Sequence, residues 1–185
     1  IAARLGANGL EQALFNLPPG DWAAGERGIA SVPGRLDEVM AGVERALPYA
    51  RATGVKRLHL MAGLGDRTDP SRVDAYRRAV SRVAARLADE GIDLMIEPIN
   101  GRNMPGYFLG DFDFAADLIA ELGIPNLRLQ FDVYHRQIMR GDVVMALRAL
   151  MPIVGHVQIA SVPSLHEPDD EELNGPFVFA ELDRL

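Results

Sequence analysis

Short apolar runs that end at turns alternate with amphipathic stretches along the whole chain. Such runs predict strands, and apolar positions three and four residues apart predict helices. The pattern predicts five strands, at about 12–16, 56–61, 92–97, 127–132 and 154–159. Helices are predicted at about 36–53, 69–90, 111–122 and 142–150, with a helical turn at 1–6 closed by Gly6 and a helix at 177–185. The stretch 133–141 is predicted to be a loop.

Regular alternation of strands and helices is typical of a parallel sheet with right-handed crossovers. A doubly wound sheet is the alternative, but no G-x-G-x-x-G motif follows the first strand, and Gly63-Leu64-Gly65 is too short a match. The pattern therefore favours an α/β fold of the (β/α)8 barrel type. Five βα units cannot close an eight-stranded barrel, so residues 1–185 are expected to form a single domain that is a partial TIM barrel.

Composition narrows the class of protein. The chain has 185 residues, 48% of them apolar, which is enough for a globular core. Its net charge of -7 argues against a nucleic-acid partner, and it has no cysteine for a disulfide, a thiolate metal site or a nucleophile. No run is long enough to span a membrane and no secretory signal is evident, so a cytoplasmic enzyme is expected. Both ends look cut, because neither falls in a linker.

Oxygen-bearing side chains recur where three consecutive strands end. Glu97 closes one apolar run, Asp132 closes the next, and Gln158 closes the last. Carboxyl ends of parallel strands share one rim, and in barrels that rim carries the chemistry. Carboxylate and amide oxygens suit Mg²⁺ or Mn²⁺, so the three residues predict a divalent-metal site. The alternative is that Glu97 caps the following turn or pairs with an arginine.

The sequence has four histidines, all on or near the strands that end at this rim. His135 follows Asp132 by three residues and is predicted to reach a substrate oxygen, the alternative being an exposed loop histidine. His166 lies in the loop after the last strand and is a second candidate for substrate binding. His156 is interpreted as a side chain of the barrel interior, with metal ligation as the alternative. His59 lies within a strand and is interpreted as structural.

A loop from Leu17 to Arg35 is much longer than ordinary connections and is typical of a lid over a site. It contains Trp22, the only tryptophan, and it contains Glu26 and Arg27. Arg27 could hold a substrate carboxylate through its planar fork, and all three residues are candidates for substrate binding. The alternative is a surface excursion packed by Trp22, in which Glu26 is only the salt-bridge partner of Arg27.

Four segments resemble the hydroxypyruvate isomerase family in order and spacing: Phe15–Gly28, Ile96–Asn100, Gln130–His135 and Gly155–Ala160. The resemblance covers essentially the whole chain. The first segment is specific to that family. The others are shared with the wider group of xylose-isomerase-like barrels, which includes ketose 3-epimerases and 2-oxotetronate isomerases.

The resemblance implies an eight-stranded barrel with a divalent metal held by Glu97, Asp132, Gln158 and a further glutamate. That glutamate, one of the family's two catalytic acid–base residues, lies on a last strand beyond Leu185. The chain is thus expected to be a fragment without the first two strands and the last one. It also departs from the family at Leu165, near the place where an arginine is common.

The activity implied is the interconversion of hydroxypyruvate and tartronate semialdehyde through a metal-stabilised enediolate. Glu97 would move the proton, and His135 would steady a substrate oxygen. The alternatives are a 2-oxotetronate isomerase or a related sugar-acid isomerase or epimerase, and a non-catalytic fragment that binds metal or sugar acid. A strand ending in glutamate beyond Leu185 would favour an enzyme. The expected partner is a small sugar acid, with no nucleic acid and no membrane. The sequence leaves open a homo-oligomer, the exact substrate and the metal.

Overall fold

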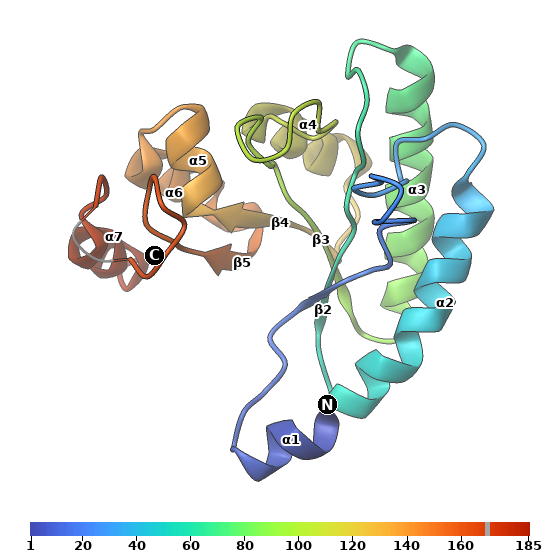
Figure 1. Cartoon of the computed structure of the whole chain (residues 1–185), viewed down its shortest axis with the longest axis horizontal. Coiled ribbons are helices and arrows are strands. Elements are labelled where there is room, and N and C mark those ends of the chain that lie inside the picture. Colours follow the sequence, from blue (N-terminus) through green and yellow to red (C-terminus); the bar gives the residue numbers. More distant parts are fainter. Residues whose placement is uncertain (169–170) are drawn as a thin grey trace.

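Five parallel strands form one curved sheet in the computed structural model, which describes residues 1–168 and 171–185 (Figure 1). The spatial order of the strands is their order in the chain, and each pairs in parallel with the next. A doubly wound sheet would reverse its order at a switch point, and this sheet does not. The strands are β1 (Phe15–Asn16), β2 (Arg57–His59), β3 (Asp93–Ile96), β4 (Leu127–Asp132) and β5 (Val154–Gln158). The expected partial (β/α) barrel is confirmed.

The helices lie mainly along the outer, convex side of this arc (Figure 1). Asp69 caps one of them by accepting a hydrogen bond from the backbone N–H of Ser71 at 2.9 Å, and Gly123 ends another in the left-handed conformation. The helices are α1 (Ala2–Ala7), α2 (Leu36–Thr53), α3 (Pro70–Ala88), α4 (Phe112–Leu122), α5 (Val133–Met139), α6 (Val143–Leu150) and α7 (Gly175–Leu182), with a short 3-10 turn at Met151–Ile153.

Two sequence predictions about helices are wrong in detail. Residues predicted as the loop 133–141 contain α5, which begins because the Asp132 side chain accepts hydrogen bonds from the backbone N–H groups of Tyr134 and His135. Helix α1 continues through Gly6 to Ala7, so Gly6 does not close it. A helix of seven residues is too short to show a clear apolar period, which explains why the sequence concealed α5.

The middle of the sheet is buried on both faces. Leu94, Met95 and Ile96 of β3 are fully buried, as is Leu58 of β2. This is why β3 appears in the sequence as a continuous apolar run, whereas β4 alternates apolar and polar residues. A charged side chain at the end of such a strand must find partners near the sheet rim.

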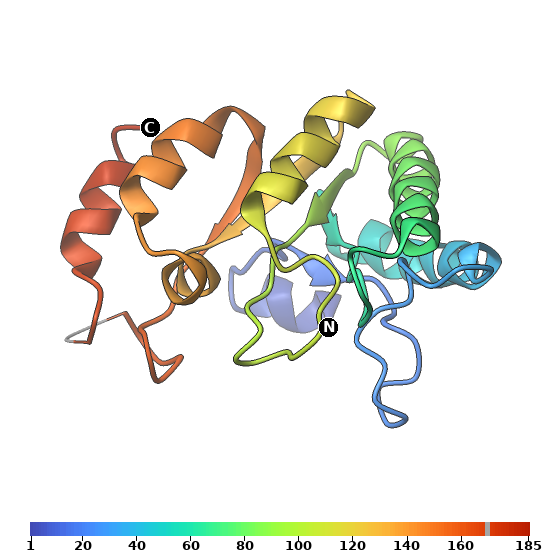
Figure 2. The same cartoon turned by 90° about the horizontal axis from the view of Figure 1, so that it is seen from above.

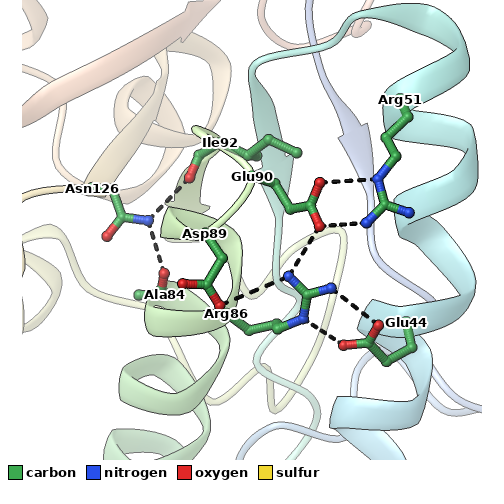
Figure 3. A network of polar contacts seen from close by, with 8 residues as sticks. All are labelled: Glu44, Arg51, Ala84, Arg86, Asp89, Glu90, Ile92 and Asn126. Atoms are coloured by element: carbon green, nitrogen blue, oxygen red, sulfur yellow. Dashed lines mark hydrogen bonds and ion pairs between the residues drawn. The ribbon is translucent and has the colours of Figure 1, made fainter.

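A polar network joins α2, α3 and the starts of two strands at the amino-terminal end of the sheet (Figure 3). Arg86 of α3 donates a hydrogen bond to Glu44 of α2. The Glu90 carboxylate accepts hydrogen bonds from both Arg51 and Arg86. Asn126, just before β4, donates its amide to the carbonyl oxygens of Ala84 and Ile92 at 2.9 and 3.0 Å. In barrels this face serves stability rather than chemistry.

The opposite, carboxyl-terminal rim carries the long loops. The loops that follow β1, β3 and β5 extend to the same side of the sheet (Figure 2). This geometry gathers residues 17–35, 97–111 and 159–168 around the strand ends. No helix within the described residues is long and apolar enough to cross a membrane.

Candidate functional site

Each strand of the sheet has a polar side chain at its last residue or at the residue directly after it, on this rim. Asn16, His59, Asp132 and Gln158 are the last residues of β1, β2, β4 and β5, and Glu97 directly follows β3. Asn16 pairs in register with His59, and Asp132 pairs with Gln158. Since parallel strands end at one edge, these five side chains form a single polar belt across the sheet.

Glu97 and Asp132 meet in the middle of the belt. One ligand atom from each, together with a ring nitrogen of His135, lies within 4.8 Å of the other two. Nε2 of His135 is 3.9 Å from Oε1 of Glu97 and 3.9 Å from Oδ2 of Asp132. The structure thus brings together two predicted metal ligands and the predicted substrate-binding histidine. Their roles stay predictions.

Glu97 is only 6% exposed, and burial raises its pKa to about 8. The negative charge of Asp132 adds to this rise, and Gln130 acts in the opposite direction. Within the described residues the only basic groups paired with Glu97 are the rings of His59, at 3.7 Å, and His135. The pairing with an arginine, considered from the sequence, is absent there. Two buried carboxylates without a lysine or arginine partner are an arrangement that a divalent cation would stabilise.

Asp132 divides its two oxygens between structure and site. Oδ1 caps α5 by accepting from the N–H groups of Tyr134 at 2.8 Å and His135 at 3.4 Å. Oδ2 faces the His135 ring. Capping and ligation are therefore compatible in this residue, because each uses a different atom.

Gln158 is linked to the carboxylates through Gln130, which lies on β4 two residues before Asp132. The side-chain amide of Gln130 donates to Oε1 of Gln158 at 2.9 Å, and Gln130 also lowers the pKa of Glu97. Gln130 is 2% exposed. Position i of a strand shares a face with position i+2, so Gln130 lies in the layer beneath the rim. Gln130 thus lies between Glu97 and Gln158, two of the three predicted metal ligands.

The His135 ring is held from behind by Asn100, whose Nδ2 is 2.7 Å from Nδ1 of His135. Burial lowers the pKa of His135, although the charge of Asp132 opposes this. The alternative of an exposed loop histidine does not hold, since only 14% of its side chain is exposed.

His59 is buried, and burial lowers its pKa to about 3, so the ring is neutral. Its Nδ1 is 3.1 Å from Oδ1 of Asn16. The sequence interpretation of His59 as structural overlooked its position against Glu97. The strand-end rule that found Glu97 would also have found His59 and Asn16. Asn100 and Gln130 carried no such signal, because one lies in a loop and the other lies inside a strand.

The long loop has its own internal order. The Arg27 guanidinium stacks over the Trp22 ring at 3.9 Å and donates to the backbone oxygens of Trp22 and Glu26. The Glu26 carboxylate pairs with Arg35, so the alternative in which Glu26 is only the salt-bridge partner of Arg27 does not hold. In the described part of the chain no hydrogen bond or ion pair joins Trp22, Glu26 or Arg27 to Glu97 or the other belt residues. Their substrate-binding role stays a prediction.

The base of this loop is fixed to the rim by a close backbone approach. Gly28 pairs with Ala62 in an isolated antiparallel bridge, with a φ of 106°. A Cβ at Gly28 would lie 2.3 Å from the carbonyl oxygen of Met61. Only glycine fits there, and the loop is thereby held against the segment that follows β2.

His166 lies outside the cluster. It is exposed, and its backbone forms hydrogen bonds with Ser161. Leu165 beside it is 51% exposed with a φ of 59°, and offers no charge to a substrate. His156 pairs in register with Gln130, and burial followed by the charge of Arg57 lowers its pKa. These neighbours suit the interior interpretation of His156.

Comparison with known proteins agrees with this fold. The family model described as xylose isomerase-like TIM barrel matches residues 1–185. A 2-oxo-tetronate isomerase of Cupriavidus necator is 50% identical over 188 residues, which cover 100% of this chain and 72% of that protein. The hydroxypyruvate isomerase of Escherichia coli is 40% identical over 181 residues, covering 95% and 69%.

A solved structure described as AP endonuclease, family 2, from Brucella melitensis superposes with a TM-score of 0.94. It is 43% identical and covers 99% of this chain and 71% of that one. The chain belongs to the xylose isomerase-like TIM barrel family. It is similar to enzymes named as isomerases, and the resemblance found in the sequence is confirmed.

Proposed function

We propose that this protein moves the carbonyl group of short 2-oxo sugar acids to the adjacent hydroxyl-bearing carbon, with Glu97 as a proton-transfer group. The observation that carries the proposal is the buried pair of Glu97 and Asp132 at neighbouring strand ends, within 4.8 Å of His135. Relatives named as sugar-acid isomerases support the reaction class.

Aldose–ketose isomerisation removes a proton from a carbon beside a carbonyl and returns a proton to the adjacent carbon. Glu97 takes the proton, and its burial makes it a stronger base than a carboxylate in water. His135 holds a substrate oxygen from the other side of the cluster. Glu97, Asp132 and Gln158 would hold a divalent cation such as Mg²⁺ or Mn²⁺, which supplies positive charge to the oxygens of the substrate. Asp132 keeps His135 in place through the cap of α5.

Two substrates of this class differ by one carbon. Hydroxypyruvate has three carbons, and the resemblance in the sequence pointed to it first. The four-carbon acid 2-oxo-tetronate is the second candidate, favoured by the 50% identity to a relative named for it. Both present a carboxylate, a ketone and a neighbouring hydroxyl group, so both suit the same proton transfer.

A substrate panel tests the proposal. The full-length protein is purified and assayed with hydroxypyruvate, 2-oxo-tetronate and neutral ketoses, with added Mg²⁺ or Mn²⁺ and with a chelator. The expected result is metal-dependent turnover of at least one acid and much slower turnover of the ketoses. Binding of an acid without turnover would instead support the non-catalytic alternative and contradict the proposal.

A further inference from the structure

The orientation of the Asn100 side chain is fixed by backbone donors. Asn100 is fully buried, three residues beyond Glu97. Its Oδ1 accepts hydrogen bonds from the N–H groups of Arg102 at 3.0 Å and Asn103 at 2.9 Å. A backbone N–H can only donate, so the atom facing these two groups must be the oxygen. The amide nitrogen therefore faces the other way, toward His135.

The donor from Asn100 decides where the His135 ring carries its proton. Nδ2 of Asn100 lies 2.7 Å from Nδ1 of His135, and the backbone N–H of Asn100 approaches the same nitrogen at 3.5 Å. Two donors directed at Nδ1 require a lone pair there. A neutral imidazole with an acceptor Nδ1 has its proton on Nε2.

The protonated Nε2 is the atom that faces the two carboxylates, at 3.9 Å from each. A nitrogen that carries a proton has no lone pair in the ring plane for a metal ion. We infer that Asn100 is a positioning residue that fixes the Nε2–H tautomer of His135, which makes His135 a hydrogen-bond donor to a substrate oxygen and excludes it from the metal shell. The hydrogen bond from His135 to a substrate oxygen rests on the proposed function. The assignment of the tautomer does not.

Asn100 and His135 are both held in place, which prevents the imidazole ring of His135 from turning over. The Asp132 side chain accepts from the backbone N–H of His135, which fixes the start of α5. The hydroxyl of Tyr134 donates to Oδ1 of Asn103 at 3.0 Å, which joins α5 to the turn that Asn100 closes. The Asn100 turn and the first turn of α5 thus form one unit around the ring. Such support commonly fixes both ring orientation and tautomer.

The tautomer is measured by long-range ¹H–¹⁵N correlation NMR on protein labelled with ¹⁵N-histidine. The chain has four histidines, and a His135→Gln variant assigns the pattern of His135. The expected pattern is a bare Nδ1 and a protonated Nε2, without metal and again after addition of Mg²⁺. A proton on Nδ1, or loss of the Nε2 proton on adding Mg²⁺, would overturn the inference.

Asn100→Asp tests the cause, because it keeps the shape and reverses the polarity at His135. The carboxylate still accepts from Arg102 and Asn103, but toward the ring it can only accept, so a proton is expected on Nδ1. Turnover is expected to fall by about 10- to 100-fold, mainly in kcat. An unchanged NMR pattern in this variant would show that Asn100 does not set the tautomer.

Asn103→Asp is the matched control. It adds the same charge to the same turn and keeps an acceptor for Tyr134, but it does not touch the ring. The His135 pattern is expected to stay as in the wild type, and a proton moved to Nδ1 by this variant would contradict the specific role of Asn100. The expected tautomer in a protein that isomerises none of the acids would refute the proposed function alone. Isomerase activity with the proton on Nδ1 would refute this inference alone.

Discussion

Asp132 contacts His135 twice, with a different oxygen each time. Oδ1 accepts from the backbone N–H of His135 at 3.4 Å, and Oδ2 lies 3.9 Å from Nε2 of its ring. The first contact starts α5, and the second belongs to the carboxylate cluster. The two roles of Asp132 can be separated by mutation, because the cap of α5 needs only a hydrogen-bond acceptor and the carboxylate cluster needs the negative charge.

Asp132→Asn is expected to keep the helix cap and lose the site. Asparagine caps helices as well as aspartate does, so stability in the absence of metal should stay close to that of the wild type. Turnover should fall at least about tenfold. Mutating groups that only orient a metal ligand typically costs that much activity, and Asp132 is itself a predicted metal ligand. Asp132→Ala should lose the same activity and in addition about 1 kcal/mol of stability. Urea unfolding and steady-state kinetics on both variants check this. Equal stability of the two variants would show that the cap contributes nothing.

Replacing Asn126 is expected to lower stability and leave activity unchanged, the opposite of Asp132→Asn, because Asn126 lies at the amino-terminal end of the sheet. Asn126→Ala leaves the carbonyl groups of Ala84 and Ile92 without their donor and should cost about 1 to 3 kcal/mol of stability. Its kcat at a temperature where it is folded should equal that of the wild type. Asn8→Ala, which removes one exposed hydrogen bond, is the control and should change stability by less than about 0.5 kcal/mol. Loss of kcat in folded Asn126→Ala would argue that the two rims are not independent.

The contribution of Glu181 to the stability of the fold is expected to depend on pH. It lies on α7, is 2% exposed, and accepts from Arg148 of α6 at 3.0 Å. The hydrogen bond from Arg148 lowers the pKa of Glu181 below the ordinary 4.5. A carboxylate with a lowered pKa stabilises the fold above its unfolded value, and that stabilisation is lost as pH falls through the folded value.

Glu181→Gln should therefore be less stable than the wild type at about pH 7, and the difference should close as pH falls below about 4.5. Urea unfolding at about pH 7, 5 and 3 measures this. Glu121→Gln, which removes an exposed partner of Arg77, is the control and should differ little from the wild type at every pH. A deficit of Glu181→Gln that persists unchanged at about pH 3 would mean that the charge of Glu181 is not its cause.

The sequence predicted the order of strands and helices well, because short strand runs and longer amphipathic helices differ in the period of their apolar positions. The apolar run of β3 and the alternation of apolar and polar residues in β4 both indicate a strand, and glycines such as Gly54 and Gly123 mark helix ends. The edge strand β1 was predicted too long, since only Phe15 and Asn16 pair with β2. Helix α5 was missed because its start depends on the Asp132 cap rather than on an apolar period.

The site was predicted where position along a strand decides it and missed where loop geometry does. Glu97 and Asp132 could be paired from the sequence because both mark strand ends. Asn100 could not, because its contact with His135 depends on a turn closed by its own side chain. The pairing of Glu26 with Arg35 rather than Arg27 depends on the path of a long loop, which no local pattern specifies.

Proton transfer by Glu97 is tested most directly by isomerisation in D₂O, with deuterium in the product followed by NMR. We expect metal-dependent incorporation of deuterium at the carbon next to the carbonyl. Glu97→Gln should keep the fold and lower the rate of isomerisation by about 10² to 10⁴. Glu121→Gln again serves as the control with wild-type behaviour. A product free of deuterium, formed by Glu97→Gln as fast as by the wild type, would show that Glu97 does not move a proton and would contradict the account.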